Sequence, residues 1–298
     1  MSLRVGLVGY GLAGEVFHAP LIEAVDGLEL AGIATRSRGG WPELLDAIDV
    51  LVVATPNASH AEYARAGLER GLFVVVDKPL APSAADARRL VHERLTVFQN
   101  RRWDGDFLTL RRLIAEGALG PVTRFESRFE RWRPEVDADA WRELADESEG
   151  GGLLLDLGTH LVDQAIVLFG PPVSVHAEVG RRRDGAAVDD DVFLALEHAG
   201  GERSHLWMSM TARHPGPRFR VSGLRDGFVS EGLDPQEVQL KDGLRPGDPG
   251  FGEAPGLDPG RYVDFYTGVR DWARGEAPPP VDPADALRVL EILEAARG

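Results

Sequence analysis

A carboxylate and an imidazole stand four residues apart in an apolar stretch, and this pair could carry acid–base chemistry. Asp156 and His160 lie in the run from Gly150 to Gly170, which predicts a helix ending at Phe169. A spacing of four puts both side chains on one face of that helix. A carboxylate beside an imidazole fixes the tautomer of the ring and raises its basicity. The pair therefore suits a proton acceptor in the oxidation of an alcohol.

Two other interpretations of this pair remain open. The two side chains could satisfy each other's hydrogen bonds in a protein core, because burying either one without a partner would be costly. They could also be ligands of a metal ion. Two ligands do not make a metal site, however, and no further clustered ligands stand near Asp156 and His160. We therefore expect no bound metal.

A lysine between an acid and a proline is the second candidate for chemistry. Asp77, Lys78 and Pro79 follow an apolar stretch, residues 73–76, that predicts a strand. In open parallel sheets, ligands bind at the carboxyl ends of the strands. A partly desolvated lysine near a nicotinamide cation would have its pKa lowered towards the range useful for acid–base catalysis. The alternative is a surface lysine in a loop.

A glycine-rich turn near the N-terminus predicts a phosphate-binding site. Gly9, Gly11 and Gly14 follow the apolar run Leu3–Val8, and a helical pattern begins at Leu12. Gly9 permits the tight turn, Gly11 lets a pyrophosphate approach the backbone, and Gly14 lets the helix pack on the strand. The N-terminus of the helix presents free N–H groups to the phosphates. We expect a dinucleotide to contact Gly9, Gly11, Leu12, Ala13 and Gly14.

The residues after the second predicted strand bear on the choice between NADP and NAD. An NAD enzyme usually carries an acidic residue there, which binds the ribose 2′-hydroxyl. Thr35, Arg36 and Ser37 include no acid. Arg36 can bind a 2′-phosphate and the two hydroxyls can donate to it, so the sequence favours NADP over NAD. The alternative for Arg36 is a solvated charge at a strand end.

The composition limits the classes of function. The chain has 298 residues, a formal net charge of −15 and no cysteine, which excludes disulfides, thiolate metal sites and cysteine nucleophiles. A nucleic-acid partner would need a basic patch against the acidic field, and the arginine clusters at 101–102 and 181–183 are short. No apolar run approaches the roughly 18 residues of a membrane span, and no signal-peptide pattern is seen. We expect a cytoplasmic protein with no nucleic-acid or membrane partner.

The first hundred residues alternate between strand and helix patterns, which predicts a mostly parallel, doubly wound α/β sheet. Pro20 predicts a break or kink in the first helix. The connections near 38–41, 92–95 and 252–257 are unusually short. They are either true deletions or places where the printed sequence joins segments whose loops are absent, and the abrupt strand start at Leu95 favours the second interpretation. We expect strands at 3–8, 28–34, 50–54, 73–76 and 95–98, and helices at 42–47, 58–70 and 83–92.

The second half of the chain has a different pattern, with several strands in series and few helices. It predicts an α+β domain with a large, mostly antiparallel open sheet. The Gly200–Gly201 pair indicates a hairpin turn. Residues 241–260 are rich in glycine and proline and predict a loop. We expect strands at 122–132, 173–179, 191–198, 203–211, 218–222 and 227–231, and helices at 104–116, 261–274 and 283–297.

The glycine turn, the Asp77-Lys78-Pro79 triplet and the Asp156–His160 pair occur in an order that resembles the Gfo/Idh/MocA oxidoreductase family (glucose–fructose oxidoreductase, inositol dehydrogenase and relatives). Several shorter segments are similar to the branch that includes NADP-dependent scyllo-inositol dehydrogenases. The family usually has glutamate where this chain has Asp77. The resemblance implies a catalytic group of Lys78, Asp156 and His160. It also implies cofactor contacts at Thr55, Pro56, Asn57, His60, Asp77 and Lys78.

The same resemblance implies a domain organisation. A dinucleotide-binding Rossmann domain would cover residues 1–102, and a substrate and oligomerisation domain would cover 103–282. The helix at 283–297 would pack back on the first domain, and the active site would lie between the two domains. The family also implies a homodimer or homotetramer formed through the sheet of the second domain.

The predicted function is hydride transfer between NADP or NAD and a secondary alcohol or ketone of a sugar or inositol-like polyol. Asn100, Arg101 and Trp103 are the main candidates for substrate contacts, and Arg133, Trp141 and Tyr262 could line the same pocket. Two alternatives remain open. One is redox-assisted glycoside cleavage on the same scaffold, and the other is a dinucleotide-binding sensor without turnover.

Overall fold

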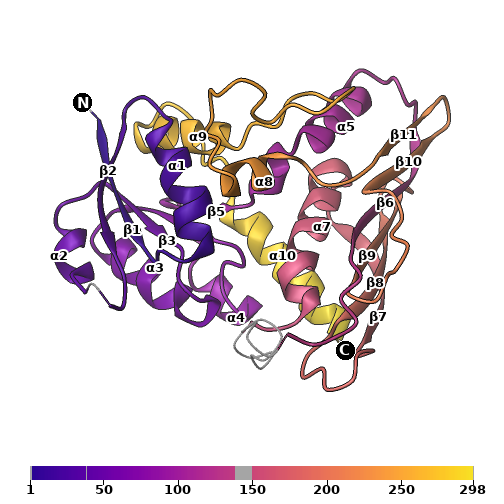
Figure 1. The fold of residues 1–298 in the computed structure, drawn as a ribbon, viewed down its shortest axis with the longest axis horizontal. Coiled ribbons are helices and arrows are strands. Elements are labelled where there is room, and N and C mark those ends of the chain that lie inside the picture. The colour runs from indigo at the N-terminus through magenta and orange to yellow at the C-terminus, as the bar shows by residue number, and fades with distance from the viewer. Residues whose placement is uncertain (1, 38, 138–149, 298) are drawn as a thin grey trace. The chain divides into compact units, whose positions relative to one another are not determined.

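The computed structural model describes residues 2–37, 39–137 and 150–297. These residues form two packing units, each built on its own sheet (Figure 1). The first unit comprises residues 1–81, 85–108 and 234–287, and the second comprises 82–84, 109–233 and 288–298. Helices α5 (Gly105–Ala115) and α10 (Pro283–Arg297) each begin in the first unit and end in the second. The domain boundaries expected from the sequence stay predictions.

The sheet of the first unit has five strands, all parallel, in the order β2-β1-β3-β4-β5. Every residue of β3 and β5 is buried, as expected for strands covered on both faces. The strand order reverses between β1 and β3, which makes that point the crevice where ligands bind in such sheets. The strands are β1 (Leu3–Val8), β2 (Leu28–Ala34), β3 (Val50–Val53), β4 (Phe73–Asp77) and β5 (Leu95–Phe98).

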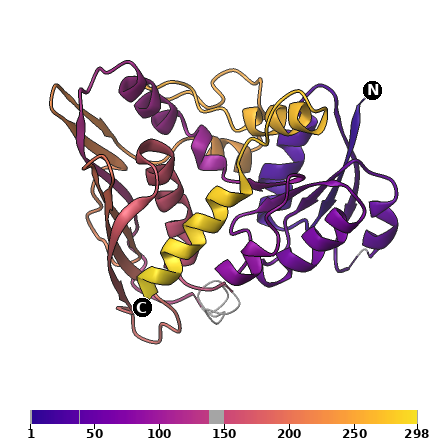
Figure 2. The same cartoon turned by 180° about the vertical axis from the view of Figure 1, so that it is seen from behind.

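Short helices connect these strands, and α1 and α3 lie on opposite faces of the sheet (Figures 1 and 2). The first crossover is a π-helical turn, η1 (Ala13–His18), followed by α1 (Ala19–Glu23). Pro20 lies in the first turn of α1, which follows η1 without an interruption, so the helix is not broken at Pro20, and a kink there stays a prediction. The other connections are α2 (Trp41–Leu45), η2 (Asn57–Ser59), α3 (His60–Glu69) and α4 (Ala84–Arg88).

Helix α4 is shorter than the predicted helix at 83–92, because the chain turns before β5. The N–H of Leu95 donates to the carbonyl of His92 at 3.0 Å, which closes a tight turn directly before the strand. The rest of the first unit includes η3 (Asn100–Trp103), α8 (Gln236–Lys241) and α9 (Val263–Ala273). Helix α8 was not predicted, whereas α9 agrees with the expected helix at 261–274.

The sheet of the second unit has six strands in the order β11-β10-β6-β9-β8-β7. All neighbouring strands are antiparallel except β6 and β9, which run parallel. The predicted mostly antiparallel sheet is therefore confirmed. Its strands are β6 (Val122–Glu130), β7 (Pro172–Gly180), β8 (Asp191–His198), β9 (Arg203–Ser209), β10 (Phe219–Gly223) and β11 (Gly227–Ser230).

Side chains of this sheet alternate between a buried face and an open face. On β6, Phe125, Ser127 and Phe129 are buried, whereas Arg128 and its neighbours on the other face form a row of ion pairs. Helix α7 (Leu153–Phe169) lies on the buried face, and the figures show no helix of the described chain on the other (Figures 1 and 2).

Two features complete the second unit. The end of α10 runs beside α7, where a Cβ on Gly158 would lie 3.0 Å from a methyl of Leu293 (Figure 2). Gly170 ends α7 with φ 77°, in agreement with the predicted glycine stop.

No helix in the described part of the chain has the length and apolar character needed to cross a membrane.

Candidate active site

The glycine turn after β1 has the geometry that a dinucleotide site requires. Gly9 has φ +96°, and a Cβ there would lie 2.3 Å from the carbonyl oxygen of Ala54. A Cβ on Gly14 would lie 2.3 Å from the carbonyl oxygen of Gly9, so this glycine lets the π-helical turn pack against the loop. A Cβ on Gly11 would meet nothing within 4 Å. Crowding thus requires glycine at positions 9 and 14, whereas Gly11 faces open space, and the predicted contact of Gly11 with a pyrophosphate stays a prediction.

The segment after β2 is a tight, exposed turn. The N–H of Gly39 donates to the carbonyl of Thr35 at 2.8 Å, and the hydroxyl oxygens of Thr35 and Ser37 are 3.1 Å apart. Arg36 and Ser37 are exposed. A guanidinium and two hydroxyls are therefore available at this strand end, and no acidic side chain stands among residues 35–37.

A buried histidine joins the loops that follow β3 and β4. The ring nitrogens Nδ1 and Nε2 of His60 lie 2.8 Å from the carbonyl oxygens of Pro79 and Thr55. Burial lowers the pKa of His60, although Asp77 and the two carbonyls act in the opposite direction. A neutral imidazole donates through only one nitrogen, so one contact is a hydrogen bond and the other a close approach. His60 can therefore act on the predicted cofactor loop, residues 55–57, by holding it against the loop after β4.

The Asp77-Lys78-Pro79 triplet begins where β4 ends, at the edge of the sheet that also carries the glycine turn. The Lys78 N–H donates to Oδ1 of Asp77 at 2.9 Å, and the Lys78–Pro79 peptide is cis. Lys78 is half-buried. The structure thus places Lys78 in the first unit with Gly9, Gly11 and Gly14, at the carboxyl ends of parallel strands.

Two residues behind Asp77 were not predicted as part of the site. His18 is buried, with Nε2 4.0 Å from Oδ1 of Asp77 and Nδ1 2.6 Å from the Tyr266 hydroxyl. Burial lowers the pKa of His18 to about 4. A neutral His18 that accepts from Tyr266 presents its Nε2–H towards the Asp77 carboxylate. The sequence signal that could have identified this contact with Asp77 was the position of His18 at the end of the first predicted helical segment.

The Asp156–His160 pair lies on α7, one turn apart, as predicted. His160 is buried, with its ring centroid 6.4 Å from that of Phe129, and Asp156 is half-buried in the first turn. The helix begins at a contact that the sequence did not indicate. Oδ2 of Asp189 accepts the Leu154 N–H at 2.6 Å, and a Cβ on Gly152 would lie 2.3 Å from Oδ1 of the same carboxylate. Asp189 therefore caps the helix that carries the pair.

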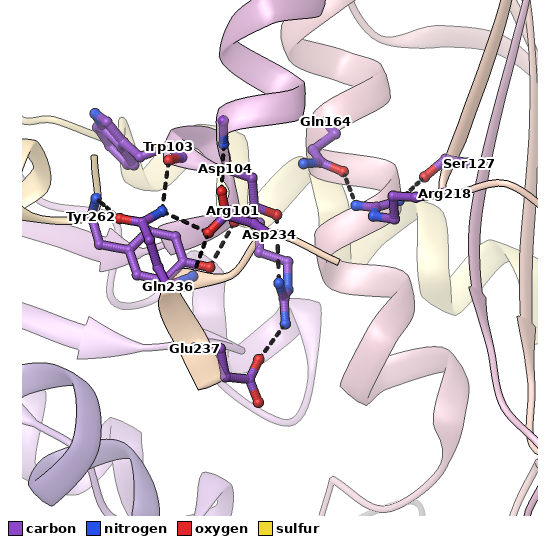
Figure 3. Close-up of polar contacts among 11 residues, drawn as sticks. Arg101, Trp103, Asp104, Ser127, Gln164, Arg218, Asp234, Gln236, Glu237 and Tyr262 are labelled. Carbon is purple, nitrogen blue, oxygen red and sulfur yellow. Dashed lines mark hydrogen bonds and ion pairs between the residues drawn. The ribbon is translucent and has the colours of Figure 1, made fainter. Parts of the chain in front are cut away.

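The candidate substrate residues after β5 make structural contacts in the first unit (Figure 3). Arg101 donates to Glu237 at 2.8 Å and lies 3.4 Å from Asp104. The Trp103 carbonyl accepts from Gln236 at 3.2 Å. Asn100 is buried. The substrate contacts of Asn100, Arg101 and Trp103 stay predictions.

The other pocket candidates are Arg133, Trp141 and Tyr262. Tyr262 is fully buried, and its hydroxyl donates to Asp104 at 2.6 Å (Figure 3). Its polar atom is thus engaged within the first unit. Trp141 lies outside the described residues.

Two family models match the chain. Residues 37–94 match the oxidoreductase family model with the NAD-binding Rossmann fold, and residues 107–229 match the Gfo/Idh/MocA C-terminal domain. The first match includes β3 and β4 of the parallel sheet, and the second includes the strands of the open sheet, so the two models match different sheets.

Similar proteins cover almost the whole chain. The uncharacterized oxidoreductase YdgJ of Escherichia coli is 40% identical over 332 residues, covering 98% of this chain and 95% of that protein. The scyllo-inositol 2-dehydrogenase (NADP(+)) IolW of Bacillus subtilis is 33% identical, covering 99% of this chain and 93% of that protein. The alignment with YdgJ is longer than the 298 residues of this chain, which agrees with shorter connections here.

Solved structures agree with these relationships. The yvaA protein of Bacillus subtilis has a TM-score of 0.92 at 32% identity, covering 99% of this chain and 95% of that one. An oxidoreductase from Bacillus cereus has a TM-score of 0.87 at 26% identity, with the same coverage. With its glycine turn, its two sheets and these relatives, the chain belongs to the Gfo/Idh/MocA family of oxidoreductases, enzymes with an NAD-binding Rossmann domain.

Proposed function

We propose that the protein is an NADP-preferring dehydrogenase that acts on a secondary alcohol or ketone of a sugar or inositol-like polyol. The observation that carries this proposal is the edge of the parallel sheet, where open space at Gly11 occurs with Lys78 at the end of β4. The printed activity of IolW, a scyllo-inositol 2-dehydrogenase that uses NADP(+), supports the choice of substrate class.

The residues present fit a bound dinucleotide. Backbone N–H groups after Gly11 would hold the pyrophosphate, and the crowding at Gly9 and Gly14 keeps that turn in place. The loop at Thr55, Pro56 and Asn57 would contact the nicotinamide half, with His60 holding the loop. Arg36, aided by Thr35 and Ser37, would bind a 2′-phosphate, which is the reason for preferring NADP.

The composition of the chain supports a chemical role for Lys78. Of the 33 lysines and arginines, only Lys78 and Lys241 are lysines. The chain thus uses arginine almost everywhere that a positive charge is needed. An arginine cannot lose its proton in a protein, whereas a lysine can do so when its surroundings lower its pKa. A lysine at position 78 therefore suits a role in which the proton is shared or transferred.

The mechanism assigns one task to each catalytic residue. His160, oriented by Asp156, accepts the hydroxyl proton of the alcohol, and the hydroxyl becomes a carbonyl. Lys78 donates a hydrogen bond to the same oxygen and stabilises its developing negative charge. The nicotinamide, when bound, supplies the acceptor for the hydride that leaves the carbon. In the reverse direction His160 returns the proton to the new alcohol.

We also propose that the protein forms a homodimer or homotetramer through the open face of the second sheet. Phe193, His205 and Trp207 form a cluster of rings on this face, with centroids 5.1 to 5.9 Å apart, and Arg128 stacks 4.0 Å from the Trp207 ring. A sheet face with aromatic residues and no covering helix suits contact with a second copy. Sedimentation of the wild-type protein at several concentrations tests this association.

The experiment that tests the function combines cofactor binding with turnover. NADPH and NADH are titrated into the protein, and inositols, sugars and their keto forms are then screened by nicotinamide absorbance. Tighter binding of NADPH with turnover of a cyclic polyol is the expected result. Cofactor binding without redox turnover would contradict the proposal, and net glycoside cleavage would favour the hydrolase alternative. Failure to bind either cofactor would remove the basis of the proposal.

A further inference from the structure

A buried arginine beneath α7 takes no part in the mechanism given above. Arg218 is 3% exposed and directly precedes β10. Its guanidinium carbon lies 4.3 Å from the ring centroid of Phe129 and 4.1 Å from that of Phe219. A planar guanidinium stacks on aromatic rings in a way that a lysine ammonium does not. The side chain is therefore fixed between two rings in the core of the second unit.

The same guanidinium holds α7 by a hydrogen bond. Nη2 of Arg218 donates to Oε1 of Gln164 at 2.8 Å, and Nη1 donates to the hydroxyl of Ser127 on β6 (Figure 3). Gln164 is fully buried. Because the bond joins the helix to a strand of the sheet, it fixes how α7 is rotated about its own axis.

The residue held in this way lies in line with the proposed catalytic pair. Gln164 is four residues after His160, which is four residues after Asp156, so the three share one face of α7. A rotation of the helix that moved Gln164 away from Arg218 would also turn His160. The Arg218–Gln164 bond therefore constrains the direction in which the imidazole points.

A second contact leads from Arg218 to His160 through an aromatic ring. Phe129 stacks on the guanidinium and also faces the imidazole, with ring centroids 6.4 Å apart and planes inclined by 55°. Removing the guanidinium leaves Phe129 free to shift into the vacated space. The imidazole would then lose its fixed neighbour as well as the support of the helix.

We propose that Arg218 is a positioning residue for His160, acting through Gln164 on α7 and through the ring of Phe129. The proposal rests on the proposed function in that His160 is taken as the proton acceptor. Arg218 itself contacts neither substrate nor cofactor in this scheme. Its effect is on the orientation of the imidazole, and a catalytic group displaced by about 1 Å loses rate by roughly a hundredfold.

The main variant is designed to separate positioning from stability. Arg218→Met alone leaves Gln164 buried without its donor, which is destabilising. The double variant Arg218→Met/Gln164→Leu makes both ends of the Arg218–Gln164 bond apolar, which recovers stability relative to Arg218→Met alone. If Arg218 only stabilises the fold, the double variant regains both the melting temperature and kcat. If Arg218 positions His160, the double variant regains the melting temperature while kcat stays low.

Arg128, on β6 of the same sheet, provides a matched control. It also stacks on an aromatic ring, with its guanidinium carbon 4.0 Å from the centroid of Trp207, but it lies on the open face of the sheet. Arg128→Met removes an arginine–aromatic contact without touching α7. Sedimentation checks that the control and the wild type have the same assembly state, because Arg128 lies on the proposed association face.

Three measurements are made on the cofactor-loaded protein and each variant: the melting temperature, kcat with KM for the polyol, and the NMR signal of the His160 ring. The chain has eight histidines, so the His160 signal is identified by its absence in His160→Asn. We expect Arg218→Met/Gln164→Leu to lower kcat by about ten- to a hundredfold with little change in KM. We expect its His160 signal to shift, whereas that of Arg128→Met stays in place.

The outcomes separate this inference from the proposed function. An unshifted His160 signal in the double variant, or recovery of kcat together with the melting temperature, would overturn the inference alone. A wild-type protein without polyol turnover would overturn the proposed function. The NMR comparison would then still decide whether Arg218 sets the orientation of the His160 ring.

Discussion

At the scale of single residues, the site depends on side chains whose chemistry the neighbouring residues adjust. Lys78 is half-buried and anchored by its own N–H on the Asp77 carboxylate. Asp77 in turn faces His18, which is kept neutral by burial because its pKa falls to about 4. A neutral His18 adds no positive charge beside Lys78. In the proposed mechanism, the charge of Lys78 acts on the oxygen of the substrate.

Lys78→Ala should abolish turnover and leave NADPH binding within about threefold of wild type, because the lost group stabilises the transition state rather than the cofactor. Steady-state kinetics and a fluorescence titration measure the two effects. Lys241→Ala is the matched control, since Lys241 is the other lysine of the chain and pairs with Glu237 within α8. A Lys78→Ala enzyme with normal kcat would contradict the mechanism.

Arg36→Ala should weaken NADPH binding by roughly ten- to a hundredfold and leave NADH binding almost unchanged, because only NADPH carries the 2′-phosphate. Calorimetric titration with both cofactors measures the selectivity. Arg70→Ala serves as a control, because Arg70 is an exposed arginine of the same unit, 3.6 Å from Asp46. Equal losses for both cofactors would indicate that Arg36 does not bind the 2′-phosphate.

At the scale of elements, the glycine turn and the Asp156–His160 pair each depend on contacts at the beginning of a helix. The glycine turn leads into η1, and the Gly150–Gly152 turn leads into α7, where Asp189 receives the Leu154 N–H. In both places glycines let another part of the chain approach closely, at the carbonyl of Ala54 and at the Asp189 carboxylate. These close contacts fix the backbone where each helix begins. Substituting a crowded glycine should therefore affect stability, whereas substituting an uncrowded one should not.

Gly11→Ala and Gly14→Ala should separate binding from folding. A Cβ at Gly11 meets nothing within 4 Å, so Gly11→Ala should keep the melting temperature and weaken NADPH binding. A Cβ at Gly14 meets the Gly9 carbonyl at 2.3 Å, so Gly14→Ala should lower the melting temperature. Thermal unfolding without cofactor and NADPH titration measure the two effects. A Gly11→Ala protein that binds NADPH normally would show that the pyrophosphate lies elsewhere.

Asp189→Ala should destabilise the protein by about 1–3 kcal/mol, because it removes the cap of α7 and takes the side-chain acceptor from the buried Leu154 N–H. Urea unfolding measures the change. Asp191→Ala is the control, since Asp191 is more exposed and pairs with Arg182 near the surface. Equal stabilities of the two variants would show that the Asp189 contact does not hold the helix.

At the scale of the whole molecule, a buried network of hydrogen bonds joins residues of the first unit that are far apart in the sequence. Asp104 accepts the Tyr262 hydroxyl, and Asp234 accepts the Gly105 N–H at 2.7 Å (Figure 3). Burial raises the pKa of Asp104 to about 7 from an ordinary value near 3.8. The folded state thus binds a proton more tightly than the unfolded state does at this carboxyl.

This raised pKa predicts a pH dependence of stability. The contribution of the protonated Asp104 carboxyl to the free energy of unfolding is fully present below pH 3.8 and is lost as the pH rises through about 7. Asp104→Asn should therefore lose less stability than wild type between pH 5 and pH 8, by an amount on the order of 1 kcal/mol or more. Urea unfolding at the two pH values measures the difference. Asp46→Asn, at an exposed site, should behave like wild type.

The sequence by itself determined the elements and the local motifs. Periodicity and apolar runs placed all eleven strands to within two residues or so at each end, because a buried strand needs a run of apolar residues. The glycine spacing indicated the dinucleotide turn, because positive φ and close approach leave few alternatives to glycine. The length of α4 and the presence of α8 escaped prediction, because short helices have weak patterns and depend on their neighbours.

The tertiary structure alone decided which distant residues support the motifs. His18 and Tyr266 meet behind Asp77, Asp189 caps α7, and Arg218 reaches Gln164 across 54 residues of sequence. None of these pairs has a local signature, because hydrogen bonds between distant segments depend on how strands and helices pack. Arg101 was predicted to contact the substrate, but its bond to Glu237 became visible only when segments 136 residues apart were brought together.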